Sequence, residues 1–440
     1  MSMLLHNAFI YRGGAEIPEA FPNGAILIDG AKIAWIGPAT DCPAEGRAAR
    51  KVDLGGRVII PGLINTHAHG GLSTHRGCCD DGDLFEWAGS LAPHTSHLTI
   101  EDNRRGCTLA VLEMLRNGIT TACDCTRYGA GVFSEVATSL GMRSLGGALA
   151  NSPELRPTGR TNWPLALDET RDAMARNTGN PLARFYLGGH SPYSCTPELL
   201  QEIKRAAEDL GLPFVIHAAE NQRENALVQE KFGKSPIRWL ADLGVLDRNS
   251  ILAHCVWLDE ADIAILAASG AKVAHNPVSN AKLASGTAPV PAMRAAGIAV
   301  GLGTDSTLSN NNLDLFQEMK LAVLMQRLHS LDGYALLARD AFAMATHAGA
   351  KVLGWGDEIG RLVPGYQADL VVLNLDHPLG LTPDRVLSDI VYRIGPREVN
   401  AVMVAGEMIL QGGVFTTADD VGLETEIYNY YRSVPKGLKT

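Results

Sequence analysis

The sequence predicts an α/β fold, a parallel (β/α)₈ (TIM) barrel joined to a small β domain. Eight short apolar runs between residues 58 and 302 alternate with helix-like stretches, and eight is the number of parallel strands that closes a barrel. Strand-like runs also occur near both ends of the chain, and neither end alone is long enough for a good core. A doubly wound open sheet is the competing architecture. Such a sheet usually has a Gly-rich loop after its first strand, where this chain reads Asn65-Thr66-His67-Ala68-His69.

The terminal strands are separated by turn residues such as Asp29-Gly30 and Gly55-Gly56, which predicts antiparallel hairpins. The runs are Ala25–Ile28, Lys32–Ile36 and Val58–Ile60 near the start, and Ala368–Leu373, Ala401–Val404 and Met408–Leu410 near the end. We expect residues 1–57 and 359–440 to form one composite β domain around a barrel of residues 58–358.

The barrel strands are predicted at Val58–Leu63, Ile119–Asp124, Ser144–Ala148, Arg184–Gly188, Phe214–Ile216, Ile251–Ala253, Lys272–Ala274 and Ile298–Leu302. Helices are predicted between them at Asp102–Arg116, Pro197–Leu210, Glu224–Leu243, Asp259–Ala268 and Val290–Ala296. The stretch Thr196-Pro197-Glu198 is typical of a helix start, because it provides a capping hydroxyl, a proline in the first turn and an early acid.

Composition and charge exclude several classes of protein. Hydrophobic residues make up 46% and charged residues 20% of the 440 residues, which is typical of a globular chain with a large core. The net charge of −10 argues against a nucleic-acid partner. No apolar run is long enough to span a bilayer, and eight scattered cysteines form no disulfide framework. These features predict a cytoplasmic protein without a membrane partner, and they leave a homo-oligomer open.

Six of the thirteen histidines and one aspartate share a single position relative to the predicted strands. The active site of a barrel is built from residues just past the C-terminal ends of its strands. His67 and His69 follow the first strand, His190 the fourth, His217 the fifth, His254 the sixth, His275 the seventh and Asp305 the eighth. This convergence predicts a site at the mouth of the barrel.

The pair His67 and His69 suggests a metal site, because alternate residues of an extended chain point the same way. With His217 and Asp305 it provides three imidazoles and a carboxylate, a donor set suited to one divalent cation. We expect Zn²⁺, with Fe²⁺ or Mn²⁺ as alternatives. The chain has no C-x-x-C motif, which separates this site from the cytidine-deaminase type.

Glu220 lies three residues beyond His217 in the run HAAE. There it can stand beside the metal without binding it, and can carry a proton. A solvated loop acid is the ordinary interpretation of an isolated glutamate. Its position next to a predicted ligand favours the catalytic interpretation.

The motifs PGLINTHAH, HAAE, LAHC, AHNPVSNAKLASG and GLGTDS resemble those of the amidohydrolase superfamily. The similarity extends from about residue 25 to about residue 410. Within the superfamily, the chain most resembles the branch that includes S-adenosylhomocysteine/methylthioadenosine deaminases and s-triazine hydrolases. The resemblance implies a distorted (β/α)₈ barrel with a β-sandwich assembled from both termini. It implies a mononuclear metal on His67, His69, His217 and Asp305. No lysine lies in residues 184–190, where binuclear relatives keep a carboxylated lysine.

The resemblance also implies roles for Glu220, which would protonate a ring nitrogen, and for His254, which would orient the attacking hydroxide. The segment Gly189-His190-Ser191-Pro192-Tyr193 resembles one in adenosine-type deaminases in which the histidine contacts the purine. The stretch Pro93-His94-Thr95-Ser96-His97 lacks the glutamate with which those enzymes hold the ribose hydroxyls, so ribose recognition is left open.

Four residues are therefore candidates for substrate binding: His190, His275, Trp87 and Arg156. Trp87 could stack on a flat ring, although core packing explains it nearly as well. Arg156 could hold a carboxylated tail, although an ordinary surface arginine is the simpler interpretation.

The function expected from the resemblance is hydrolytic deamination of an amino-substituted N-heterocycle, such as an adenosine-like purine or a pterin. Hydroxide on the metal attacks the carbon that bears the amino group, Asp305 accepts the water proton, and ammonia is released. An s-triazine amino- or chlorohydrolase is the alternative, although such enzymes commonly lack equivalents of His190 and His275. A cyclic amidohydrolase and a non-catalytic scaffold are less favoured, because the bridging lysine is missing and every expected ligand is present.

Overall fold

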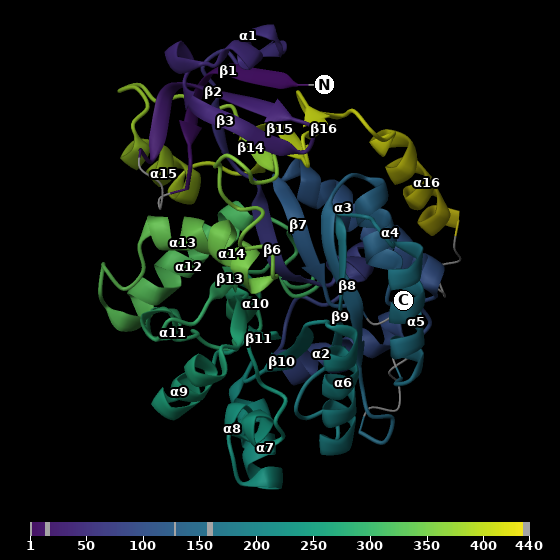
Figure 1. Ribbon diagram of the computed structural model, residues 1–440. Coiled ribbons are helices and arrows are strands. Elements are labelled where there is room, and N and C mark those ends of the chain that lie inside the picture. The colour runs from purple at the N-terminus through teal and green to yellow at the C-terminus, as the bar shows by residue number, and fades with distance from the viewer. Residues whose placement is uncertain (1, 14–17, 127–128, 156–161, 434–440) are drawn as a thin grey trace.

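The computed structural model describes residues 2–13, 18–126, 129–155 and 162–433, which form two sheets (Figure 1). An eight-stranded parallel sheet lies at the centre, and a nine-stranded sheet of terminal strands covers one end of it. The predicted α/β barrel with a terminal β domain is confirmed. The division of the chain at residues 58 and 358 stays a prediction.

The barrel sheet contains eight consecutive strands, each parallel to the next. They are β6 (Leu63–Ala68), β7 (Ile119–Asp124), β8 (Arg143–Ala150), β9 (Ala183–Gly189), β10 (Phe214–Ala218), β11 (Ser250–His254), β12 (Lys272–His275) and β13 (Val300–Leu302). Between the last strand and the first, a parallel bridge joins Ala68 to Asp305. The sheet is therefore a nearly closed barrel, and the C-terminal ends of its strands share one mouth.

Helices surround the barrel and bury their apolar faces on it. They are α3 (Ile100–Arg116), α4 (Val132–Ser139), α5 (Leu165–Arg176), α6 (Pro197–Leu210), α7 (Gln222–Phe232), α8 (Pro236–Asp242), α9 (Glu260–Ser269), α10 (Pro277–Lys282), α11 (Val290–Ala295), α12 (Leu315–Ser330), α13 (Ala338–Ala345) and α14 (His347–Val352). The single helix predicted at Glu224–Leu243 is wrong, because two helices occupy that stretch. Gly233 ends α7 with a φ of 71°, and Ser235 caps α8 ahead of Pro236.

The barrel strand predicted at Val58–Leu63 is wrong in its first part, whereas the terminal strand predicted at Val58–Ile60 is confirmed. Val58–Pro61 forms β5, which pairs with β1 (Met3–Tyr11) and β14 (Leu370–Leu373) in the terminal sheet. The chain then passes Gly62 and enters the barrel at Leu63. A Cβ atom on Gly62 would lie 2.2 Å from Oγ1 of Thr120, so only glycine fits this crossing.

The terminal sheet is mixed and draws strands from both ends of the chain. Its other strands are β2 (Ala20–Asp29), β3 (Lys32–Pro38), β4 (Arg50–Asp53), β15 (Val399–Val404), β16 (Glu407–Gln411) and β17 (Val414–Phe415). The predicted hairpin pattern holds for β2–β3 and β15–β16, whereas β1 runs parallel to β4 and β5. Ile10, Ile26, Leu370 and Met403 share one core cluster, so the two ends of the chain depend on each other for burial.

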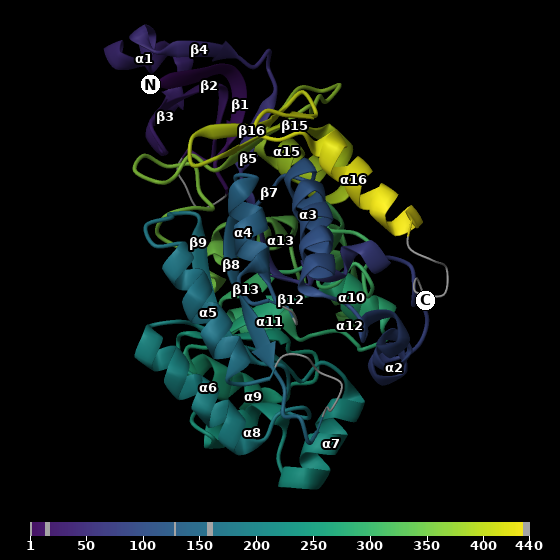
Figure 2. The same cartoon turned by 90° about the vertical axis from the view of Figure 1, so that its right-hand side faces the viewer.

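The remaining elements connect these layers. They are α1 (Ala44–Ala48), α2 (Leu84–Thr95), α15 (Pro383–Tyr392), α16 (Asp420–Ser433) and three short 3₁₀ helices at Ala39–Asp41, Gly70–His75 and Pro396–Glu398. Figure 2 shows α16 alongside α3, where Arg116 makes ion pairs of 2.6 Å with Asp420 and 2.5 Å with Glu424. Among the described helices, none combines the length and the apolar character that crossing a bilayer requires.

Candidate metal centre and active site

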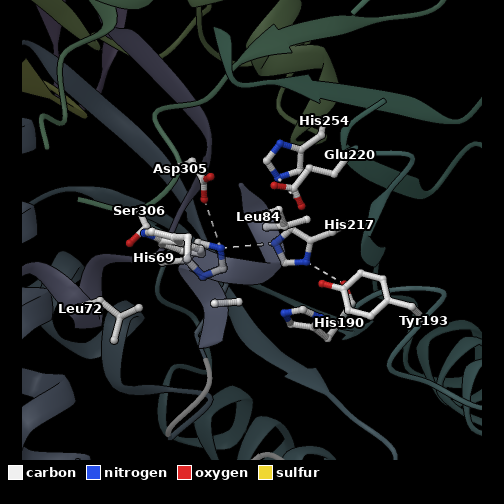
Figure 3. A pocket seen from close by; sticks show the side chains of 12 residues that line it. His69, Leu72, Leu84, His190, Tyr193, His217, Glu220, His254, Asp305 and Ser306 are labelled. Atoms are coloured by element: carbon white, nitrogen blue, oxygen red, sulfur yellow. Dashed lines mark hydrogen bonds and ion pairs between the residues drawn. The ribbon is translucent and has the colours of Figure 1, made fainter. Parts of the chain in front are cut away.

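The four predicted metal ligands converge at the mouth of the barrel. His67 is in β6, His69 directly follows it, His217 is in β10 and Asp305 follows β13. Nε2 of His67 and Nε2 of His69 each lie 3.4 Å from Oδ1 of Asp305. Nε2 of His69 and Nε2 of His217 are 3.3 Å apart (Figure 3). All four side chains are buried, so residues far apart in sequence share one enclosed site.

Backbone carbonyl groups fix the orientation of two of these imidazoles. Nδ1 of His69 donates to the carbonyl oxygen of Cys125 at 2.6 Å, and Nδ1 of His217 donates to that of His190 at 2.7 Å. A carbonyl oxygen only accepts, so each proton is on Nδ1 and the lone pair of Nε2 faces the cluster. For His67, the neighbour of Nδ1 is the thiol of Cys125, with Sγ at 3.3 Å.

Two hydroxyl groups hold the carboxylate of Asp305. Its Oδ2 accepts from Oγ of Ser279 at 2.5 Å and from Oγ of Ser309 at 2.9 Å, which leaves Oδ1 facing the imidazoles. Burial acts to raise the pKa of Asp305. The close approach of His67 and the charges of the surrounding imidazoles outweigh burial and hold this pKa well below its usual range. Asp305 is therefore ionised, as a metal ligand must be.

The donor set fits a divalent cation. The donor atoms of His67, His69 and His217 all lie within 4.8 Å of one another, as do those of His67, His254 and Asp305. Nε2 of His67 is buried and makes no hydrogen bond within the described residues. A buried polar atom without a partner is unfavourable, and a cation would accept its lone pair.

Glu220 lies two residues past β10, with its carboxyl group buried beside the cluster. Burial raises its pKa well above the usual range, and the negative charges of Asp305 and Glu224 add to this effect. Oε2 of Glu220 is 3.7 Å from Nε2 of His254. A carboxyl group that keeps its proton at neutral pH can act as a general acid.

The backbone at Glu220 is held by a second buried glutamate. Oε1 of Glu224 accepts from the backbone N–H of Ala219 at 3.1 Å, and Oε2 accepts from that of Glu220 at 2.7 Å. Ala219 has a φ of 53°, which is unusual for a residue with a side chain. Glu224 thus fixes the turn that presents Glu220 to the site.

His254 ends β11 with a φ of 76° and faces the same site. Its Nδ1 donates to Oδ1 of Asn280 at 2.9 Å, which leaves Nε2 directed toward Glu220. Burial lowers the pKa of His254 to about 4. The imidazole is therefore neutral at pH 7 and can accept a proton or a hydrogen bond.

A pocket opens onto these groups, and one part of its wall is apolar. Figure 3 shows part of its lining around the predicted metal ligands. Beyond the predicted metal ligands and Glu220, the lining consists of Leu72, Leu84, Trp87, Ala88, His190, Tyr193, His254 and Ser306. Leu84, Trp87 and Ala88 all come from α2.

The structure brings two of the four predicted substrate residues to this pocket, Trp87 and His190. His275 ends β12 and is buried, and it is not among the described residues that line the pocket. Arg156 lies outside the described residues. The roles of all four stay predictions.

Sequence reasoning missed several residues that position the site. Glu224 follows Glu220 by four residues, and this spacing on a helix start could have found it. Ser279 and Asn280 lie within the motif AHNPVSNAKLASG, but the sequence alone predicts no role for either. Ser309 has no sequence signal, because a single loop serine resembles any other.

Three imidazoles and an ionised carboxylate gathered at the mouth of a barrel are typical of metal-dependent hydrolases. More specifically, the chain belongs to the amidohydrolase family, whose sequence profile matches residues 58–409. The predicted resemblance is confirmed, and so is the expectation of a hydrolase acting on C–N bonds.

Known proteins from two branches are similar to this chain. A 5-methylthioadenosine/S-adenosylhomocysteine deaminase from Syntrophobacter fumaroxidans is 37% identical over 395 residues, which cover 89% of each chain. The crystal structure of an adenosine deaminase from Xanthomonas campestris with bound zinc has a TM-score of 0.89 at 28% identity, and covers 98% of this chain and 99% of that one. A triazine hydrolase from Arthrobacter aurescens has a TM-score of 0.87 at 23% identity over 97% and 99% of the chains, which shows the common fold.

Proposed function

We propose that this chain is a hydrolytic deaminase of an amino-substituted N-heterocycle, with an adenosine-like purine as the first candidate and a pterin as a related one. The observation that carries the proposal is the buried, proton-holding Glu220 beside the cluster of three histidines and Asp305. The names of the similar deaminases support the same reaction.

The proposed roles divide between holding the metal and moving protons. His67, His69, His217 and Asp305 would hold one divalent metal, Zn²⁺ first, which when bound activates a water molecule for attack. Asp305 would accept a proton from that water. Glu220 gives its proton to the ring nitrogen beside the attacked carbon, which removes the negative charge that addition creates.

The second half of the reaction expels the amino group. Nε2 of neutral His254 accepts a hydrogen bond from the hydroxyl group added to the ring carbon and so fixes its position. The proton taken up by Asp305 passes to the amino group, which leaves as ammonia. The proton of the added hydroxyl group returns to Glu220, and the oxygen becomes the carbonyl group of a keto heterocycle. Each positioned proton transfer contributes roughly 10²–10⁴ in rate.

The lining of the pocket favours a flat substrate that carries few polar groups on one side. Trp87 and Tyr193 offer aromatic surface for a ring, and His190 offers a polar contact at its edge. Among the described lining residues, the only carboxyl groups are those of Glu220 and Asp305. We infer that recognition rests on the ring and an apolar substituent more than on ribose hydroxyls.

An s-triazine amino- or chlorohydrolase is the second candidate. The apolar wall formed by Leu72, Leu84 and Ala88 favours it, because a small alkylated ring would fit there as well as a purine. A screen with purines, pterins and triazines distinguishes the two. Ammonia from purines or pterins supports the first candidate, whereas ammonia or chloride from triazines alone supports the second.

Replacing Glu220 with glutamine tests the proposed mechanism. We expect Glu220→Gln to lower kcat for deamination by roughly 10²–10⁴ while bound metal is retained, since an amide cannot supply the proton. Glu202→Gln, at an exposed position on α6, is the matched control and should keep full activity. Full turnover by Glu220→Gln would overturn the assignment.

A further inference from the structure

A second cavity lies at the opposite end of the barrel from the metal cluster. It has a volume of about 770 Å³ and is formed by the N-terminal ends of β11, β12 and β13, by α14 and by the segment leading to β14. Figure 1 shows α14 and β13, two of these elements, on the side of the barrel below the terminal sheet. Tyr366 belongs to its wall, and the carbonyl oxygen of Tyr366 accepts from the backbone N–H of Ile33 in β3. One residue of the cavity wall is therefore hydrogen-bonded to the terminal sheet.

The wall of this cavity is strongly basic, although the chain as a whole carries a net charge of −10. Its charged lining residues are Arg248, Lys272, Arg294, Lys351, Arg361 and a single acid, Asp357. Arg294 is paired with Asp340 at 2.9 Å. Arg248, Lys272 and Lys351 make no ion pair within the described part of the chain. The cavity thus has an excess of positive charge that the described side chains do not neutralise.

Burial and neighbouring positive charges lower the pKa values of two lining residues, Lys272 and His347. Burial lowers the pKa of Lys272; the charge of Asp247 opposes this shift and that of Lys351 adds to it. Burial also lowers the pKa of His347 to about 4, together with the charges of Arg361 and Arg294. His347 is consequently neutral at pH 7. Its buried Nδ1 has no hydrogen-bond partner among the described residues, so a polar partner is missing.

We propose that this cavity binds a small phosphate-bearing anion. Arg248 offers the planar donor fork that suits a phosphate group, and Lys272 and Lys351 add two point charges that match a dianion. The volume is in the range of small-molecule pockets and exceeds what a bare phosphate fills. The ring of Tyr366 provides a flat surface for the organic part of a phosphate ester.

This anion site is separate from the catalytic pocket and does not depend on the proposed reaction. None of its charged residues lines the pocket at the metal cluster. Because its wall includes three barrel strands and a residue that is hydrogen-bonded to β3, an anion bound there would stabilise the folded chain against unfolding. Such a ligand raises the unfolding temperature in proportion to the logarithm of its concentration once binding approaches saturation.

Calorimetric titration of the metal-loaded, full-length protein tests the proposal. The probes are inorganic phosphate and ribose 5-phosphate, with potassium chloride at matched ionic strength as the blank. We expect saturable binding, accompanied by a rise in unfolding temperature. Tighter binding of the ester identifies an organic phosphate as the ligand, and equal binding identifies the free ion.

Charge-removing variants show whether binding occurs in this cavity. Arg248→Gln and Lys351→Gln should each weaken binding by about tenfold, because each removes a charged hydrogen-bond donor. Lys320→Gln removes an exposed charge on α12 outside the cavity and should bind as the parent protein does. The unfolding temperature without ligand confirms that each variant is folded. No saturable binding to the parent, or equal affinity in all the variants, would overturn the proposal.

Discussion

At the scale of single residues, the site is built on backbone conformations that residues other than glycine seldom adopt. Ala219, His254, Cys255 and Asp305 have φ values between 50° and 76°. Such conformations cost on the order of 1–3 kcal/mol each and persist when surrounding contacts enforce them. Here the backbone N–H of Asp305 donates to the carbonyl oxygen of His67 at 2.9 Å, and Glu224 holds the turn at Ala219. The strained residues and the chemical groups therefore coincide.

Glu224 links this arrangement to pH. Burial raises its pKa from 4.5 to about 7 in the folded chain, whereas in the unfolded chain it ionises near its usual value. As pH rises from about 4.5 to about 7, the unfolded state loses this proton and the folded state keeps it. Folding is therefore progressively disfavoured across that window, by up to about 3 kcal/mol, and the effect levels off above it.

Comparison with Glu224→Gln measures this contribution. The variant has no proton to lose, so the free energy of unfolding of the parent should fall relative to that of the variant between pH 5 and pH 8. Urea unfolding of both metal-loaded proteins at the two pH values gives the difference. An unchanged difference would show that Glu224 ionises normally in the fold.

The sequence predicts the residues whose positions follow from the strand pattern, and misses those that depend on loop geometry. His67, His69, His217 and Asp305 were found because each follows a recognisable apolar strand. Ser279 and Ser309 reach Asp305 only through the detailed path of two loops. Neither residue type nor spacing distinguishes these serines from others in the chain.

At the scale of elements, α2 forms much of the apolar wall of the candidate substrate pocket and owes its position to its first turn. Asp83 caps the helix by accepting from the backbone N–H groups of Phe85 at 2.8 Å and Glu86 at 3.0 Å. The carboxylate of Glu86 accepts in return from the backbone N–H of Asp83. This capping box fixes the start of the helix that carries Leu84 and Trp87.

Removing the cap should loosen the pocket wall. We expect Asp83→Ala to lower the free energy of unfolding by about 1 kcal/mol and to raise KM about fivefold, with little change in kcat. Steady-state kinetics and urea unfolding provide the two measurements. Asp259→Ala removes a similar capping box from α9, away from the pocket, and should affect stability alone. An unchanged KM for Asp83→Ala would separate α2 from substrate binding.

Element boundaries were predictable where helix signals are strong. The predicted Pro197–Leu210 matches α6, which has Thr196 as its cap and Gly211 at its end. The strand β1 was missed, although it is central to the terminal sheet. Asn7 has a φ of 56°, and the pairing of β1 with β2 shifts register there, so the strand lacks the regular alternation that identifies such elements.

At the scale of the whole molecule, a buried ion pair joins the barrel to the terminal sheet. Nε and Nη2 of Arg143 in β8 lie 2.6 Å and 3.1 Å from the carboxylate oxygens of Asp369, just before β14. Both side chains are about 1% exposed. Asp369 also accepts from the backbone N–H of Ala405 at 2.7 Å. The contact thus connects one barrel strand to two segments of the terminal sheet.

Breaking this pair should destabilise the whole chain. We expect Asp369→Asn to lower the free energy of unfolding by about 3–5 kcal/mol, because it leaves a buried guanidinium without its counter-charge. Arg171→Gln, at an exposed arginine paired with Asp168, should change it by less than about 1 kcal/mol. Chemical unfolding measures both. A loss for Asp369→Asn as small as that of the control would contradict a role for this contact in joining the two parts.

The topology of the molecule was predictable from counting strands, whereas the junction between its two parts was not. Residues 58–64 form one continuous apolar run, yet the chain changes sheets at Gly62. Periodicity cannot mark that point, because both sheets bury this run completely. The reason for the glycine becomes evident only when Thr120 is seen beside it.

The metal content of the purified protein tests the central claim most directly. Mass spectrometry of the dialysed, metal-loaded protein should find one equivalent of a divalent first-row metal per chain, with Zn²⁺ expected. His217→Ala should lose that metal, since it removes one of the imidazoles that face Asp305, whereas Glu220→Gln should retain it. Absence of metal from the parent, two equivalents per chain, or full occupancy in His217→Ala would contradict a single ion held by these four side chains.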